Sequence, residues 1–560
     1  MKHYIYLLFA LLYMAGCNSN PEETDPINPP DGSSKAYIAF RLNDKEPVTR
    51  AIIETGTPEE SKVTNIVALM FADKRCVDVV EVKGGTIGSE TIEATASEAV
   101  AVDDRSTHAF VLINGKNTPW DVTSAIGKTW EEINRLNTLS VTSVTDDNYF
   151  TMANAGTFNE GPLVAVTLVK TGTYMTDEQA KEEARKKGVA AEIRVDRLAS
   201  KVTCEVGKTF KVMPTGATFS FDGWELNVTN KSSYLYSDLV KLTAPGASGI
   251  YRRDDNYDLS EFPAIEKEAS NRTTTEKETL AEKLRNHFHF LENKGGSIET
   301  TSEVSRKKGA SAYCLENTMA AAAQKKGITT KVVIKGKYTP KEIISAGVKS
   351  YFSWNKKYYT LEQLKTAYQQ AVKTSRNTGL GKDLPDFLKT AKISGIIEAD
   401  NNTKLDQVIA QLTIASFDKE TGIVARYMPV RYFHESVCYY DILIRHDQGI
   451  SELMALGRYG VVRNNWYTLT VNSINAPGTP WIPDPANPND PADPGINDDG
   501  GNDNPDNPDP DNPDKPNPDN PDNPGKPDPD NPDNPDSSKY ALSVSISVQP
   551  WIIKKYFTEL

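Results

Sequence analysis

A tract rich in proline, aspartate and asparagine runs from Pro483 to Asp536 and separates the last residues from the rest of the chain. Between Trp481 and Asp536 lie about 17 of the 34 prolines, together with about 16 aspartates and 2 lysines. Proline removes backbone donors, and so polar a stretch cannot bury a core. The tract is therefore predicted to be an extended, solvated linker with a reach of roughly 160 Å.

This linker also accounts for the charge of the chain. Its aspartates supply nearly all of the formal net charge of −13, so the rest of the chain is close to neutral. A net negative charge argues against nucleic acid as a partner. Loose calcium binding by the aspartate clusters stays open as an alternative to a plain spacer, although the spacing of known calcium-binding loops is absent.

Beyond the linker the chain becomes a strand again, called here the tail strand (Leu542–Ile552). Its polar face carries three serines and Gln549, and Pro550 falls on the opposite face. That opposite face is otherwise apolar and consists of Leu542, Val544, Ile546, Val548 and Ile552. A lone strand has no stability in water, so it needs a sheet edge. The long linker allows that edge to belong to another molecule.

The first 17 residues predict a lipoprotein signal. Lys2 precedes an apolar run, Ile5 to Met14, that is too short to span a bilayer stably. Small residues then lead to Cys17, as in a lipobox. Cleavage before Cys17 would free its amine and thiol for acyl chains, and each buried CH₂ adds about 0.8 kcal/mol of membrane binding. The alternative is an ordinary secretory signal with an accidental cysteine.

A second alternating segment follows a flexible tether and is called here the early strand (Lys35–Asn43). Its ladder consists of Ala36, Ile38, Phe40 and Leu42. Shortly after it, Arg50-Ala51 in a polar stretch offers a trypsin-like cleavage point. We infer that the two ladders compete for one groove, which is β-augmentation. In an uncut chain the early strand should be docked and the tail strand loosely packed.

Between these segments the chain reads as mainly β, with helices in the connections, which favours β-sandwiches over a doubly wound sheet. Strands are predicted at Val63–Phe71, His108–Asn114, Leu163–Lys170, Glu192–Val206, Thr329–Lys335, Arg426–Phe433, Tyr439–Arg445 and Val461–Ile474. Helices are predicted at Asp177–Lys187, Thr360–Lys373 and Thr403–Leu412. The helix at Thr360 opens with a capping box.

No catalytic signature stands out, so the chain is predicted not to be an enzyme and to need no cofactor or metal. His287 and His289 would share one strand face, which makes a surface strand the favoured interpretation over a metal site. His434-Glu435 lacks the continuation of a zinc protease motif. Two disulfides or four buried thiols are both open, and buried thiols are favoured, for Cys76, Cys204, Cys314 and Cys438.

Several further segments carry a resemblance when taken in order with Cys17 and Arg50-Ala51. They are Val195–Val202, Tyr313–Thr318, Arg458–Tyr467 and Val548–Trp551. Together they resemble the Bacteroidia-type fimbrillins, the type V pilus subunits, and most of all the shaft subunit of the minor fimbriae. The resemblance covers most of the chain. It implies two transthyretin-like β-sandwich domains, export as a lipoprotein, trimming by an Arg-specific protease, and polymerisation by donor-strand exchange.

The expected organisation follows from both lines of argument. It consists of a signal peptide (1–17), a tether with the early strand (18–50), an N-terminal sandwich (51–207), a C-terminal sandwich (208–480), the linker region (481–537) and the donor segment (538–560). The resemblance implies a shaft subunit that supports adhesion and biofilm formation. Its partners would be other copies of itself, anchor and tip pilins, the maturation protease and, before maturation, the outer membrane. The rival interpretation is a non-polymerising surface lipoprotein that binds glycan or host protein.

Overall fold

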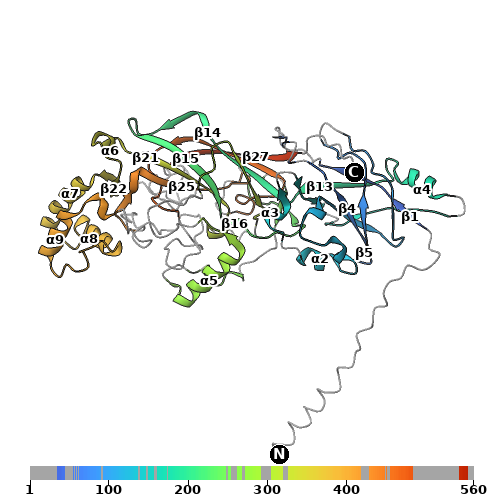
Figure 1. Ribbon diagram of the computed structural model, residues 1–560, viewed down its shortest axis with the longest axis horizontal. Coiled ribbons are helices and arrows are strands. Elements are labelled where there is room, and N and C mark those ends of the chain that lie inside the picture. The colour runs from blue at the N-terminus through green and yellow to red at the C-terminus, as the bar shows by residue number, and fades with distance from the viewer. Residues whose placement is uncertain are drawn as a thin grey trace, which may run out of the picture.

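The computed structural model describes residues 35–482, with internal gaps, and residues 542–552. The longer gaps are 45–53, 254–260, 292–303, 319–325 and 418–427. The described part is elongated, with the first strands at one end, a group of helices at the other, and long strands between them (Figure 1).

The first half of the molecule is built on two sheets. The larger has the strand order β2-β13-β10-β7-β4-β5, with β11 paired to β7, and the smaller has the order β12-β1-β6. The bounds are β1 Ala36–Ile38, β2 Phe40–Asn43, β4 Ile66–Ala72, β5 Arg75–Val82, β6 Val100–Val102, β7 His108–Ile113, β10 Met152–Asn154, β11 Val164–Ala165, β12 Val169–Lys170 and β13 Ala191–Arg197.

Strand β4 shows why this half needs two apolar cores. Its seven residues, IVALMFA, are all buried. Ile66, Ala68 and Met70 face one core. Val67, Leu69 and Phe71 face another, which the helix α2 (Trp130–Leu136) helps to close. A nearly continuous apolar run is the pattern expected of a strand that is covered on both faces.

The second half packs two further sheets around one large core. Their strand orders are β20-β14-β26-β27-β3 and β15-β21-β25. The bounds are β3 Glu54–Thr55, β14 Ala199–Val212, β15 Thr218–Asn227, β20 Ser311–Leu315, β21 Lys331–Thr339, β25 Val437–Leu443, β26 Asn465–Ile474 and β27 Leu542–Ile552. The core between them includes Trp224, Ile334 and Tyr467, all fully buried.

A helical lobe closes the far end of this half (Figure 1). Its helices are α6 Lys341–Ser345, α7 Leu361–Thr374, α8 Leu380–Thr390 and α9 Asn402–Gln411, packed on β22 Tyr351–Trp354, β23 Lys357–Tyr359 and β24 Arg431–Phe433. Helix α7 begins with the capping box predicted at Thr360, in which Gln363 is the reciprocal partner. Elsewhere lie α3 Val141–Val144, α4 Asp177–Ala184, α5 Thr274–His287, β8 Thr145–Asp146, β9 Tyr149–Phe150, β16 Thr229–Asn230, β17 Asp238–Lys241, β18 Ile250–Arg253 and β19 Phe288–His289.

The prediction of a mainly β fold with helices in the connections is confirmed. Three strand predictions need correction. In the described part of Arg426–Phe433, only Arg431–Phe433 forms a strand, β24. The segment Leu163–Lys170 forms only the short strands β11 and β12, and Glu192–Val206 breaks at Leu198. At that break the chain passes from β13 in a sheet of the first half to β14 in a sheet of the second. The boundary expected at residue 207 therefore falls inside β14.

Two predictions about single residues also have an outcome. His287 and His289 do not share a strand face, because His287 ends α5 and only His289 lies in β19. The favoured interpretation of the cysteines as buried thiols is confirmed for Cys76, Cys204, Cys314 and Cys438, all of which are free and buried.

Candidate strand-exchange site

The early strand lies in a groove with hydrogen-bonding partners on both sides. Its first part, β1, is antiparallel to both β6 and β12, and its second part, β2, runs parallel to β13. Opposite β13, the amide of Ser97 donates to the carbonyl of Phe40 at 2.8 Å, and that of Gly88 donates to the carbonyl of Leu42 at 2.8 Å. The segment is thus held as an inner strand, although it is the first described part of the chain.

The apolar ladder of the early strand is completely inside. Ile38, Phe40 and Leu42 join the core of the first half, and Ala36 and Ala39 are also fully buried. Burial of four or five such side chains contributes on the order of 6–15 kcal/mol before ordering costs. The early strand is therefore an integral part of this core in the uncut chain.

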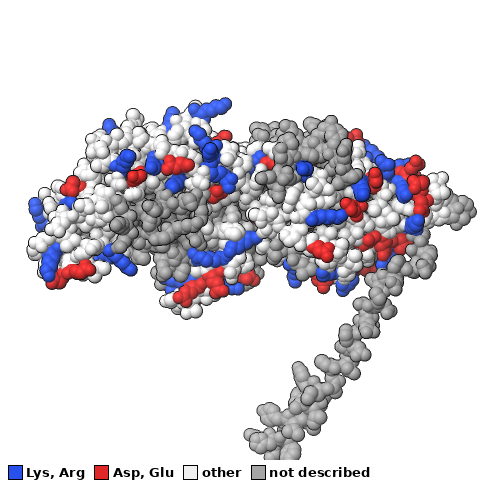
Figure 2. Space-filling model, in the orientation of Figure 1, with Lys and Arg blue, Asp and Glu red and all other residues white. Residues whose placement is uncertain are grey.

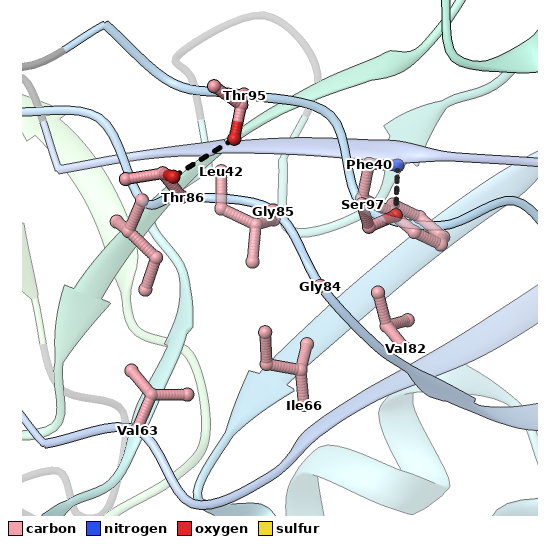
Figure 3. Close-up of a pocket in the computed structure, with 11 residues that line it drawn as sticks. Phe40, Leu42, Val63, Ile66, Val82, Gly84, Gly85, Thr86, Thr95 and Ser97 are labelled. Atoms are coloured by element: carbon pink, nitrogen blue, oxygen red, sulfur yellow. Dashed lines mark hydrogen bonds between the residues drawn. The ribbon is translucent and has the colours of Figure 1, made fainter. Parts of the chain in front are cut away.

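An apolar pocket lies directly beside this ladder (Figure 3). Phe40 and Leu42 of the early strand form one wall. Val63, Ile66, Val82 and Ile87, with residues 84–86, Thr95 and Ser97, form the remainder. The amide of Phe40 donates to Ser97 Oγ at 3.0 Å, as Figure 3 shows. Because Phe40 and Leu42 are part of the wall, loss of the early strand would open this pocket into a longer apolar groove.

The opposite face of β1 is covered by helix α4. Tyr37 packs against Ala180 and Ala184. The Lys35 ammonium lies 2.8 Å from the Asp177 carboxylate. This Lys35 contact and a hydrogen bond from Tyr37 lower the pKa of Asp177. The early strand thus supplies the partners that hold α4 in place.

The tail strand, β27, lies in the second half of the same molecule. It is antiparallel to β26 from the Ile474–Leu542 pair to the Asn465–Pro550 pair. Leu542 is fully buried, and Val544 and Ile546 are half-buried against the core. The expectation that this strand is loosely packed in the uncut chain is therefore wrong. Antiparallel pairing with β26 and an apolar face together are enough to dock it.

Strand β27 nevertheless lies near the margin of its sheet. The only other strand that pairs with it in the described residues is β3, through Trp551–Glu54 and Ile552–Thr55. From Leu542 to Pro550 its described strand neighbour is β26 alone. Removal of the tail strand would therefore uncover β26 and separate only the two-residue strand β3 from the sheet. Because the same apolar residues would have to fill a second groove, docking here and donation elsewhere exclude each other.

Some predicted site residues lie outside the described residues. These are Cys17, Arg50 and Ala51. For Val548 and Ile552 the backbone is described as part of β27 but the side chains are not.

Three of the segments that carried the family resemblance, Val195–Val202, Tyr313–Thr318 and Arg458–Tyr467, meet in a buried polar cluster between the halves. Arg463 pairs with Glu316 at 3.1 Å, and Asn464 Nδ2 donates to Asp196 Oδ1 at 3.3 Å. Asp196 also pairs with Arg252 at 2.5 Å. Sequence reasoning identified these segments one by one and missed the cluster. Charged residues inside otherwise strand-like runs were the available signal, because charges are buried only when paired.

Within the described ranges, no three His, Cys, Asp or Glu side chains gather as a metal site would require. In the same part of the chain, none of the helices has the length and apolar character needed to cross a bilayer. Basic and acidic side chains are interspersed over the face shown in Figure 2.

Among known protein families, one matches the C-terminal part of the chain. Residues 431–556 match the family model described as "Major fimbrial subunit protein type IV, Fimbrillin, C-terminal". This C-terminal part of the chain is therefore similar to the C-terminal region of fimbrillins. The matched region contains both β26 and β27 together with the linker.

Solved structures that match the chain include a fimbrilin from Porphyromonas gingivalis W83. It has 13% identity and a TM-score of 0.38, and the match covers 93% of this chain and 99% of that one. A protein from Bacteroides eggerthii DSM 20697 assigned to cell adhesion has 9% identity, a TM-score of 0.37, and coverage of 93% and 98%. The tip fimbrial protein Mfa3 from Porphyromonas gingivalis has 11% identity, a TM-score of 0.29, and coverage of 78% and 93%. Comparison with curated protein sequences gives no match.

Proposed function

We propose that this chain is a fimbrillin, the shaft subunit of a cell-surface pilus, and that it polymerises by donor-strand exchange and so supports adhesion and biofilm formation. The observation that carries the proposal is the early strand. Its apolar ladder is fully buried, its backbone is hydrogen-bonded on both sides, and it is followed at once by the segment that contains Arg50. A segment with this placement can be removed by a single cut, and its removal would leave an apolar groove of strand length.

The occupant of that groove would be the tail strand of a second copy. Its ladder matches the early strand in period and apolar character. Head-to-tail donation does not close on itself, so it builds a fibre. Docking of β27 on β26 adds a step to this scheme, because the tail strand has to leave its own sheet before it is donated. Anchor and tip subunits would begin and end the fibre.

Before maturation, the exported subunit would be a lipoprotein. Lipidation at Cys17 would hold the precursor in the outer membrane, and cleavage between Arg50 and Ala51 would release both the lipid and the early strand. Substitution Arg50→Ala with mass spectrometry of the mature N-terminus tests this step. We expect Ala51 as the first residue of wild-type fibre protein and an uncut, monomeric R50A variant. Fibre protein that retains Cys17 would remove Arg50 from the scheme.

Deletion of residues 540–560 tests donation itself. We expect the deleted protein to be exported but to give no fibres by electron microscopy and no high-mass ladder on unheated gels. A deletion of equal length inside the linker, residues 501–521, is the matched control and should leave fibres intact. Unchanged fibres after loss of the tail would refute donor-strand exchange.

One observation favours the rival function, a non-polymerising surface lipoprotein that binds glycan or host protein. The tail strand is satisfied within its own molecule, as it would be in a protein that stays monomeric. Trypsin treatment of the purified precursor separates the two functions. Polymers that form after trimming support the shaft subunit, and a trimmed protein that stays monomeric at high concentration supports the rival.

A further inference from the structure

Helix α4 is attached to the early strand by contacts that leave when the strand leaves. Lys35 pairs with Asp177 at 2.8 Å, and Tyr37 fills the space against Ala180 and Ala184. The ion pair is exposed, with 64% and 43% of the two side chains accessible. Exposed pairs add little affinity. They do select partner and register, because a wrong register leaves the charge without a partner.

A second constraint lies in the middle of the early strand. Ala39 is 0% exposed and stands between β1 in the smaller sheet and β2 in the larger one. Its carbonyl accepts a hydrogen bond from the amide of Ala191 at 2.8 Å. A larger side chain at this crossing point would displace close-packed neighbours. Any strand that takes this path needs a small residue here.

The chain contains one further stretch with the same order of features. Residues 35–43 read KAYIAFRLN and residues 539–547 read KYALSVSIS. In this alignment Lys539 stands for Lys35, and Ser543 stands for Ala39. The ladder Leu542, Val544 and Ile546 stands for Ile38, Phe40 and Leu42. The largest mismatch is at the first two positions after the lysine, where Tyr540 stands for Ala36 and Ala541 stands for Tyr37.

We propose that the tail of a second copy enters the groove in the same direction as the early strand, with Lys539 paired to Asp177 and Ser543 in the place of Ala39. This register rests on the proposed donor-strand exchange. Asp177 on α4 is then a specificity-determining residue for polymerisation, and Lys539 is its partner on the donor.

Shifted registers in the same direction conflict with the groove. A shift of two residues places Ala541 at the position of Lys35, so α4 has no cation to pair with. It also places Pro550 at the position of Asp44, whose amide donates to the carbonyl of Gly88 at 2.9 Å. Proline has no such amide.

The opposite shift of two residues fails at β1. It places Ser537 at the position of Lys35 and Lys539 at that of Tyr37, which is only 4% exposed. The lysine would then replace the aromatic ring that packs against Ala180 and Ala184, and its charge would lie in a buried place where even a pair with Asp177 costs desolvation.

The reverse direction also supplies cations, because Lys554 and Lys555 follow the tail strand. When Lys554 stands for Lys35, Pro550 takes the place of Ala39, and the polar side of the tail strand turns toward the core of the first half. When Lys555 stands for Lys35, the apolar side faces this core, but Trp551 takes the place of Ala39.

Both reverse alignments thus put a larger residue where Ala39 is fully buried. Both directions of the donor strand offer a lysine to Asp177. The small space at the position of Ala39 is therefore what distinguishes the two directions.

Disulfide trapping between trimmed copies tests the register. Glu192 is the β13 partner of Arg41. The place of Arg41 is taken by Ser545 in the proposed register. It is taken by Ser543 or Ser547 in the shifted registers, and by Gln549 in the reverse direction with the apolar side inward. Each register thus has its own donor cysteine.

Full-length Glu192→Cys is combined in turn with Ser543→Cys, Ser545→Cys, Ser547→Cys or Gln549→Cys, trimmed by trypsin and oxidised. We expect reducible ladders with Ser545→Cys, at least about tenfold more than with the other three. A preference for another donor cysteine would overturn the register while leaving strand exchange intact. Absence of ladders together with absence of polymers would refute strand exchange itself.

A charge exchange tests the proposed pair between Lys539 of the donor and Asp177. Asp177→Lys and Lys539→Glu are each expected to slow polymerisation by about 3- to 10-fold, as an exposed pair allows, and the double variant should recover. Rescue of Asp177→Lys by Lys554→Glu or Lys555→Glu instead of Lys539→Glu would reverse the direction of the donor.

Glu178→Lys is the control for this exchange. Glu178 lies next to Asp177 on α4 but pairs with Lys181 at 2.8 Å. We expect Glu178→Lys to polymerise at nearly the wild-type rate. If Glu178→Lys slowed polymerisation as much as Asp177→Lys does, the slowing would be due to the general charge of α4, and the specific Lys539–Asp177 pair would be refuted.

Discussion

The Lys201 ammonium lies 2.7 Å from the Glu60 carboxylate, and only 4% and 3% of these side chains are exposed. The Tyr313 hydroxyl donates to the same carboxylate at 2.6 Å, and Lys201 Nζ lies 3.5 Å from the centre of the Trp466 ring. Glu60 follows the predicted cut at Arg50 and precedes β4. The pair therefore fastens the new N-terminal segment to β14 of the second half, so trimming need not loosen the joint between the halves.

We expect Glu60→Gln to lower the free energy of unfolding by about 3–5 kcal/mol at pH 7, because it leaves Lys201 buried without a counter-charge. The double variant Glu60→Met with Lys201→Met should cost less, since no charge stays buried. Denaturant unfolding of the trimmed protein measures both. Equal losses in the single and the double variant would contradict this account of the pair.

The same pair predicts a dependence on pH. Burial alone would raise the pKa of Glu60, but hydrogen bonds from Lys201 and Tyr313 outweigh it, so the pKa is below its ordinary value of 4.5. A lowered carboxyl pKa stabilises the fold above the ordinary pKa, and this contribution is lost as the pH falls through the lowered value. The stability difference between wild type and Glu60→Gln should therefore be full at neutral pH and shrink below about pH 4.5. A difference that grows in acid would be inconsistent with the ion pair.

Phe40→Ala should destabilise the uncut precursor by about 3–5 kcal/mol, because it empties a buried aromatic site in the core of the first half. Lys35→Ala is the matched control on the same strand and should change stability by no more than about 1 kcal/mol. After trimming, both variants should unfold like the trimmed wild type, since neither residue is retained. A Phe40→Ala defect that persists in the trimmed protein would mean that the early strand is not removed.

A disulfide between Thr468→Cys and Ser547→Cys should lock the tail strand on β26, because these residues stand opposite each other in the antiparallel pair. We expect the oxidised, trimmed protein to stay monomeric and to polymerise on reduction. Either single cysteine variant serves as control and should polymerise under both conditions. Polymers of the locked protein would show that donation does not require release of β27.

The native thiols should not interfere with these experiments. Burial raises the pKa of Cys76, Cys204 and Cys314 to about 12 and that of Cys438 to about 11. Since the thiolate is the reactive form, the four thiols of the trimmed protein should react with a thiol reagent about 100-fold or more slowly when folded than when unfolded. Rapid labelling of the folded protein would place at least one of them at the surface.

Local sequence pattern was sufficient to predict a strand or a helix where residues of one type repeat at a fixed period. The alternation in Ala36–Leu42 and Leu542–Ile552 identified both strands, and the capping box at Thr360 identified the start of α7. Pattern failed at Leu198 and in Leu163–Lys170. There the chain changes sheets or pairs only briefly, and strand propensity does not encode which neighbour is available.

The candidate strand-exchange site also has features that the sequence predicts and features that it does not. The sequence by itself determined that two apolar ladders exist, that a linker without a core separates one of them from the body, and that an arginine follows the other. These properties depend on period and composition alone. Only the tertiary structure decided that the early strand is an inner strand beneath α4, and that the tail strand is docked on β26 of its own molecule. Both facts depend on pairing between residues far apart in the chain, because a strand is stabilised by whichever edge the rest of the fold presents to it.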